Sequence, residues 1–306
     1  MSEQQELEEL MLRQEVKNLM QQAARRSNTI SLPNGCLVVM LVVKEHVINF
    51  VFWNTILDMI ESEVKRLGYT FQMHVVDDSK DEWLRPEATG YILLGRLPHQ
   101  CFTQVEALKK PIVWVDCENE FGNYGQVRVN NRCGTYMLTK RAIELGHRRL
   151  AFCGGSAHRS YEERGEGMMS CVREYSALGV TCEVISNRGN PAETKRMLVE
   201  LLTRRNAPTF IQCASDSGAQ AVYAAAKSLM LKIPDDLSIA GFDNIKEAHL
   251  MEPPLTTVGV PRMDMAITAV ELLVKQMNAP LAANEVILLE PEMVLRESMA
   301  APGGKR

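Results

Sequence analysis

The sequence predicts an α/β protein of two lobes, each built on a parallel sheet with helices on both faces. Short, continuously apolar runs recur along its 306 residues, with LVVMLVV at 37–43 as the clearest example. Such runs are typical of strands that are buried on both faces of a parallel sheet. Amphipathic stretches of helical length separate them, and the strand–helix–strand units fall on either side of residue 130, with about four strands each. Repeated units of this kind form parallel sheets through right-handed crossovers.

The first half follows a leading segment of different character. Residues 2–26 are polar with one apolar helical stripe and contain no Gly or Pro, so they predict a single helix, and residues 27–35 then form a linker with turn signals. Strands are predicted at 37–43, 69–76, 91–95 and 111–116, with a helix at 50–68 that ends at Gly68.

The second half continues the same alternation. Helices are predicted at 135–146, 165–179, 194–205 and 218–230, and strands at 149–155, 181–186, 209–214 and 237–243. A last helix at 263–277 precedes a pair of strands within 285–298.

Composition excludes several classes of protein. A net charge of −4 gives no long-range attraction for nucleic acid, and the longest apolar run, residues 36–43, is far shorter than a membrane span. No secretory signal is visible, so a cytoplasmic location is expected. The eight cysteines include no C-x-x-C pair and the six histidines no H-E-x-x-H motif. We therefore expect reduced thiols, no metal site and no cofactor.

Candidate ligand-binding residues follow the predicted strands, because ligands of open α/β sheets bind beyond the carboxyl ends of the strands. Carboxylate, guanidinium, amide and hydroxyl groups with an aromatic face suit a small polyhydroxylated ligand. The candidates are Asn49, Phe50, Asp116, Ser160, Arg164, Ser215 and Asp243.

Several of these positions also have structural interpretations. Asp216 is expected to be a helix N-cap, and Trp53 is expected to be a core residue more than a ligand platform. Asp116 fits a loop cap as well as a ligand contact, and Arg164 fits a solvated charge at the start of a helix.

Five segments resemble the LacI/GalR family of transcriptional regulators and occur in the family's order. They are ELGHRRLAFCGG (144–155), SYEERGEG (160–167), IPDDLSIAGFDNI (233–245), EPPLTTVGVP (252–261) and VLRES (294–298). The resemblance extends over about residues 36–300. It implies two periplasmic-binding-protein-like lobes joined by three crossovers, with a sugar-like effector between them and a homodimer as the working state.

The resemblance also assigns lobes and roles. Its implied N-terminal lobe is residues 36–129 with 262–289, and its C-terminal lobe is 130–261 with 290–300. Ser160 and Arg164 resemble the family's sugar-contacting serine and arginine, and Asp243 its hydroxyl-binding aspartate. Asp116 resembles the aspartate after the fourth strand, and Asn49-Phe50 the loop after the first strand.

Three departures from the family leave parts of this implication open. Residues 1–35 show no helix-turn-helix of the kind that reads a major groove, so DNA binding by this chain is an open question. Ser215 stands where many members carry an asparagine. Asn130-Asn131 replaces a common acid–amide pair at the first crossover, and Val260 stands where some members place a polar residue.

Two functions therefore compete. One is a dimeric, effector-responsive regulator, and the other is a stand-alone cytoplasmic sugar- or nucleoside-binding protein. An enzyme is the weaker hypothesis, because the sequence has no G-x-S-x-G elbow and no Walker A motif.

Overall fold

The computed structural model describes residues 36–43, 51–76, 84–95, 97–116, 124–155, 159–186, 191–279 and 285–303. The chain divides into two compact units, Met1–Gly35 and Cys36–Arg306. The helix and linker predicted for residues 1–35 lie outside the described residues, as do the candidates Asn49 and Phe50. Within the described residues, no helix has the length and apolar character needed to cross a membrane.

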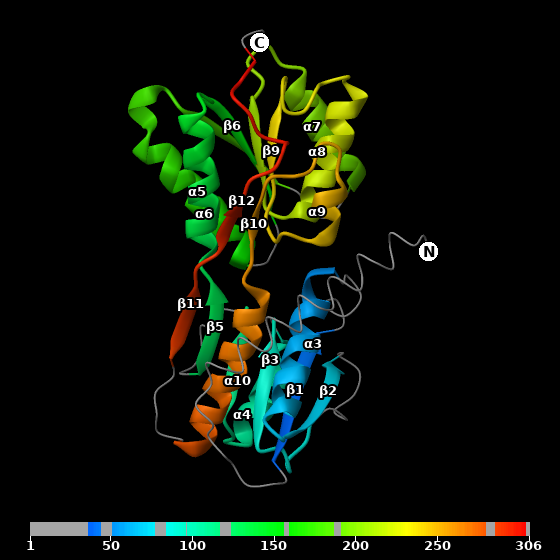
Figure 1. The fold of residues 1–306 in the computed structure, drawn as a ribbon, viewed down its shortest axis with the longest axis vertical. Coiled ribbons are helices and arrows are strands. Elements are labelled where there is room, and N and C mark those ends of the chain that lie inside the picture. The colour runs from blue at the N-terminus through cyan, green and yellow to red at the C-terminus, as the bar shows by residue number, and fades with distance from the viewer. Residues whose placement is uncertain are drawn as a thin grey trace. The chain divides into compact units, whose positions relative to one another are not determined.

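The first sheet of the larger unit has six parallel strands in the order β11-β5-β4-β3-β1-β2 (Figure 1). Its strands are β1 (Leu37–Val43), β2 (Thr70–Val76), β3 (Gly90–Leu94), β4 (Ile112–Val115), β5 (Gly125–Val129) and β11 (Val286–Leu289). The strands β1, β3 and β4 are almost completely buried, as their continuous apolar runs predict.

Helices cover both faces of this sheet. Helices α3 (Val51–Arg66) and α10 (Arg262–Asn278) pack together, and Leu273 of α10 lies against Gly90 at the start of β3. The next position, Tyr91, points to the opposite face, where it joins a core cluster with residues of α4 (His99–Ala107).

The second sheet has four parallel strands in the order β7-β6-β8-β9. Its strands are β6 (Arg149–Cys153), β7 (Thr181–Ile185), β8 (Phe210–Cys213) and β9 (Ser238–Ala240). The helices that accompany them are α5 (Asn131–Glu144), α6 (Arg159–Glu174), α7 (Pro191–Leu202), α8 (Asp216–Ser228) and α9 (Lys246–Leu250). A 3-10 turn lies at Ser176–Leu178.

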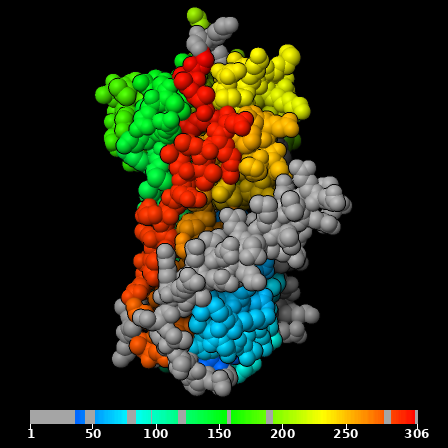
Figure 2. Space-filling model, in the orientation of Figure 1, coloured from blue at the N-terminus to red at the C-terminus, as the bar shows by residue number. Residues whose placement is uncertain are grey.

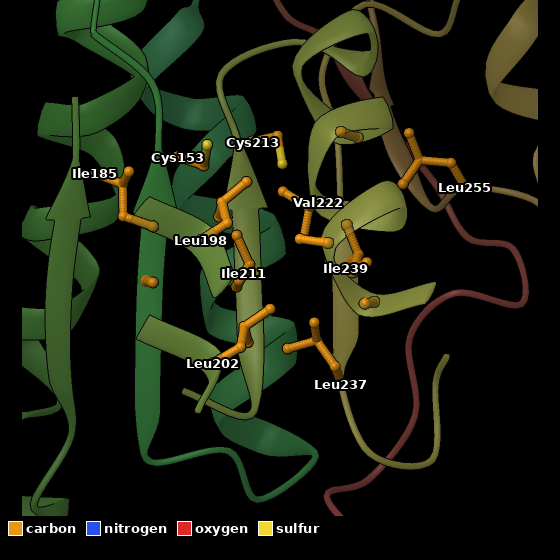
Figure 3. Packing of buried hydrophobic residues seen from close by; sticks show 14 of the residues in the cluster. Cys153, Ile185, Leu198, Leu202, Ile211, Cys213, Val222, Leu237, Ile239 and Leu255 are labelled. Atoms are coloured by element: carbon orange, nitrogen blue, oxygen red, sulfur yellow. The ribbon is translucent and has the colours of Figure 1, made fainter. Parts of the chain in front are cut away.

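The core of the second sheet lies on the face covered by α7 and α8. Figure 3 shows Leu198 of α7 and Val222 of α8 over Ile211 of β8, with Cys153 and Cys213 at neighbouring positions of β6 and β8. The opposite face meets α5, whose Thr139 hydroxyl donates to Gln212 Oε1 at 2.7 Å.

The chain passes between the two sheets three times, after β5, between β10 (Thr257–Gly259) and α10, and between β11 and β12 (Glu292–Val294). Strands β10 and β12 pair antiparallel, so the second and third passages run beside each other. On the face drawn in Figure 2, the last of these segments forms a continuous red band. All three passages leave the same region, beyond the carboxyl ends of the strands, where the candidate site lies.

The predicted α/β fold with two parallel sheets is confirmed. Four details were wrong. The two strands expected within 285–298 do not pair with each other, since β11 extends the first sheet and β12 pairs with β10. The first sheet has six strands instead of about four, because β5 was missed and β11 joins it, whereas the second sheet has the four that were predicted. Helix α5 begins at Asn131 instead of 135, and α6 begins at Arg159 instead of 165.

Candidate functional site

Two charged residues that were predicted to follow β6 and β9 meet in the structure. Nη1 of Arg164 lies 3.1 Å from Oδ1 of Asp243, and both side chains are buried. Asp243 has a φ of 113°, which is uncommon for a residue other than glycine. Its backbone N–H donates to Val258 O at 2.8 Å, which anchors this loop to β10. The site thus begins with a buried ion pair on a strained loop.

The Arg164 guanidinium is fixed by neutral partners as well. Its Nε donates to Oδ1 of Asn131 at 2.9 Å, and Nη1 donates to Ala214 O at 2.6 Å. The plane also lies over the Phe242 ring, with Cζ 3.7 Å from the ring centroid. No hydrogen bond within the described residues engages Nη2, so this end of the guanidinium keeps its two donors.

A second buried carboxylate joins this network from α6. Glu163 accepts hydrogen bonds from Nη2 of Arg128 at 2.5 Å and from Nδ2 of Asn131 at 3.0 Å. Arg128 belongs to β5 of the first sheet, whereas Glu163 belongs to a helix of the second. Asn131, the first residue of α5, therefore links two ion pairs next to the first passage.

Asp116 lies directly after β4 with a φ of 53°, and it is half-buried. Burial raises its pKa to about 7, an effect that the Arg164 guanidinium opposes and the carboxylates of Asp243 and Glu163 reinforce. These mutual influences place Asp116 in the same charged group as Arg164 and Asp243.

The two serine candidates lie at the starts of helices. Ser160 is half-buried in the first turn of α6, one turn before Arg164, so the two residues share a helix face. Ser215 is the N-cap of α8, and its hydroxyl accepts from Gly218 N at 3.1 Å. A hydrogen bond to Ser215 also lowers the pKa of Tyr161 against the larger effect of burial.

Asp216 was expected to be the N-cap of this helix, and that expectation was wrong. It is the first residue inside α8 and is fully buried, with its carboxylate accepting from the Thr257 hydroxyl at 2.5 Å and from Ile245 N at 2.9 Å. Burial raises its pKa to about 7. The carboxylate holds β10 against the loop after β9, because one residue binds both segments.

Sequence reasoning gave no side-chain role to several residues that line this region. Asn131 was noted only as a departure at the crossover, and Tyr161 and Glu163 only as letters of a motif. Arg262, at the start of α10, was not singled out, although its Nη2 donates to Asn244 O at 3.0 Å. A signal for Asn131 was its place two residues after the end of β5, a strand that was missed.

The arrangement offers fixed hydrogen-bond donors and acceptors around buried charged groups. Among the described residues, no group of three or more His, Cys, Asp or Glu side chains could hold a metal ion. Buried carboxylates beside guanidiniums with spare donors are suited to binding the hydroxyl groups of a polar molecule.

Comparisons with known proteins give a consistent result. Residues 139–299 match the periplasmic binding protein-like domain. The chain is similar to the ribose operon repressor of Haemophilus influenzae, with 30% identity over 194 residues that cover 63% of this chain and 58% of that protein. It is also similar to the uncharacterized HTH-type transcriptional regulator YvdE of Bacillus subtilis, with 28% identity over 262 residues that cover 86% and 80% of the two chains. The chain thus spans less than two thirds of the length of the Haemophilus repressor.

Solved structures share the fold. A LacI family transcriptional regulator from Enterococcus faecium with bound ribose superposes with a TM-score of 0.74 and 22% identity, covering 87% of this chain and 99% of that one. The lac repressor dimer bound to operator and the anti-inducer ONPF gives a TM-score of 0.72 and 19% identity, covering 93% and 98%. The relatives are transcriptional regulators, not enzymes.

Proposed function

Because this chain belongs to the periplasmic binding protein-like domain family and forms the effector-binding core of a LacI/GalR-type regulator, we propose that it binds a small sugar-like effector and thereby switches a dimer. The observation that carries the proposal is the Arg164–Asp243 pair at 3.1 Å with Asp116 in the same charged group. Carboxylates accept from hydroxyl groups and Nη2 of Arg164 donates to them, so a vicinal hydroxyl pair fits this chemistry.

The proposed mechanism is a population shift between two arrangements of the lobes. The acidic and basic groups come from both sheets, since Asp116 follows β4 whereas Arg164 and Asp243 accompany β6 and β9. A ligand that contacts all three groups favours the arrangement in which they lie close together. The N-terminal lobe is predicted to comprise residues 36–129 with 262–289, and the C-terminal lobe residues 130–261 with 290–300. The cytoplasmic location also remains a prediction.

Asp116→Asn tests the binding role of this group. Asparagine tolerates a positive φ, so we expect the fold to be retained, while one charged acceptor is lost. A thermal-shift panel of sugars and nucleosides first identifies a ligand, which stabilises the protein by about 2.7 kcal/mol at a hundred times its Kd. Calorimetry should then show binding weakened by about 1.5–3 kcal/mol in Asp116→Asn, the range of a hydrogen bond to a charged group.

The matched control is Arg173→Ala, which removes an exposed charge from the last turn of α6. It should leave the affinity unchanged. Equal affinity of wild type and Asp116→Asn for the ligand would remove Asp116 from the site.

A stand-alone binding protein is the alternative, and DNA binding and dimer formation separate it from a regulator. A regulator should retard DNA from its own promoter region in a gel-shift assay, with binding that falls steeply as salt rises. Sedimentation should show a dimer whose affinity for this DNA changes when the ligand is added.

A further inference from the structure

Arg262 lies next to the proposed effector site and was not predicted from the sequence to belong to it. It is the first residue of α10, directly after the passage from β10. Its side chain is half-buried, with Cζ 5.7 Å from the ring centroid of Phe52 on α3 and Nη2 3.0 Å from the carbonyl oxygen of Asn244, the residue after Asp243. The guanidinium therefore lies between a helix of the first sheet and the loop that carries Asp243.

The acidic groups nearest to Arg262 are already engaged by other residues. Asp243 pairs with Arg164 at 3.1 Å, and both carboxylate oxygens of Asp216 accept hydrogen bonds from Thr257 and Ile245. Arg262 itself takes part in no ion pair within the described part of the chain, although Asp243 and Asp216 act on it electrostatically from a longer distance.

The two arginines of the site differ in how their donors are used. Nε of Arg164 donates to Asn131, and its Nη1 donates to Ala214 O and pairs with Asp243. Arg262 has one hydrogen bond, to a neutral carbonyl, out of the five N–H donors of a guanidinium. Burial lowers the pKa of Arg262, whereas Asp243 and Asp216 oppose this shift, so its charge is partly removed from water beside carboxylates that have other partners.

From this geometry we propose that Arg262 selects an effector that carries an acidic group, a phosphate or a carboxylate, on a sugar-like body. The inference rests on the proposed function and names the ligand class of the same site. The planar fork of arginine binds two oxygens of a phosphate or carboxylate at once, whereas a neutral hydroxyl can use only part of it. The body of the ligand meets Arg164, Asp243 and Asp116, and its acidic group meets Arg262.

Pairs of neutral and acidic sugars test the inference on the full chain. Calorimetry compares ribose with ribose 5-phosphate, glucose with glucose 6-phosphate, and glucose with gluconate, so that phosphate and carboxylate are distinguished. In the pair that contains the preferred sugar, we expect the acidic member to bind ten- to a hundredfold tighter, which is the range of charge-assisted hydrogen bonds.

Arg262→Gln should abolish this preference, because glutamine has neither the charge nor the planar fork of arginine, and it should weaken binding of the acidic member at least tenfold more than binding of the neutral member. Arg262→Lys should keep part of the preference, since it retains a point charge without the fork. Arg173→Gln, which removes an exposed charge on α6, is the matched control and should behave as wild type.

The outcomes separate the two proposals. Neutral members that bind as tightly as acidic ones, or an unchanged preference in Arg262→Gln, would overturn the inference and leave the proposed function standing. An absence of binding by every member of the panel to wild type would count against the proposed function and the inference together.

Discussion

Replacing Arg164 by methionine should destabilise the second sheet and its loops strongly, because it leaves Asp243 charged and without its ion partner. The side chains of Arg164 and Asp243 are 4% and 13% exposed, so water can replace the lost partner only in part. Breaking a buried ion pair by removing one member costs about 3–5 kcal/mol. Arg164→Met keeps much of the apolar contact with Phe242, so most of the loss is electrostatic.

The penalty should also depend on pH. Burial already raises the pKa of Asp243, and Arg164 opposes that rise, so removing Arg164 raises the pKa further. An acid whose pKa is higher in the folded than in the unfolded state destabilises the fold above its folded pKa, and this effect disappears as the pH falls toward about 4. The difference between wild type and Arg164→Met should therefore be larger at pH 7.5 than at pH 5.

Urea unfolding followed by circular dichroism measures these free energies, with Arg173→Met as the matched surface control. Asp243→Asn and the double variant complete a thermodynamic cycle. We expect the free energy of unfolding of the double variant to fall by at least about 1 kcal/mol less than the sum of the losses in the two single variants. Each single change leaves the other charged residue without its partner, and this cost is absent when both are changed. Additive losses, with no dependence on pH, would refute the view that the two groups stabilise each other.

Two further predictions concern residues that support the site. Gly167→Ala should lower the free energy of unfolding by about 1–3 kcal/mol in the same assay, because a Cβ there would collide with the Arg132 carbonyl and the Thr135 hydroxyl of α5. Gly218→Ala is the control and should leave the free energy of unfolding unchanged, because its Cβ would lie 3.4 Å from the nearest atom. Between pH 5 and pH 8, Asp216→Asn should lose about 2–3 kcal/mol less stability than wild type, since a buried carboxyl with a pKa of about 7 lowers the stability of the fold as the pH rises from its unfolded pKa of about 4 to its folded pKa. The same loss in both proteins would show that Asp216 is not the group that titrates.

The strands that were predicted from the sequence are those whose apolar composition indicates burial. Strand β1 is apolar at every position, whereas the missed strand β5 contains Gln126 and Arg128 among its five residues. Gln126 is nevertheless buried, and Arg128 reaches Glu163. Strand β5 is polar because it lies beside the first passage, where side chains from the two sheets meet. A local sequence pattern does not show that the strand has this position.

The glycines of α6 misled the sequence analysis for a similar reason. The helix was predicted to begin at Gly165, whereas α6 begins six residues earlier and has Gly165 and Gly167 in its interior, where glycine usually weakens a helix. Gly167 is buried against α5, and it lets the two helix backbones approach closely enough for Asn131 to reach both Glu163 and Arg164. The cost to helix propensity is thus offset by a contact between helices that a one-dimensional pattern does not show.

The residues of the candidate site likewise fall into a group that could be predicted from the sequence and a group that could not. Arg164, Asp243 and Asp116 could be predicted because they follow strands, and parallel strands place their carboxyl ends at one edge. Asn131 was missed together with β5, the strand that it follows, and Arg262 could not be predicted because it enters the region from the passage after β10. Arg262 contacts Asn244 across 18 residues of chain that include all of β10. In the proposed movement of the lobes, residues that come from the passages would change their surroundings, whereas strand-end residues would stay with their own sheet. For this reason we expect affinity to depend on the strand-end group, and the choice among ligands on Arg262.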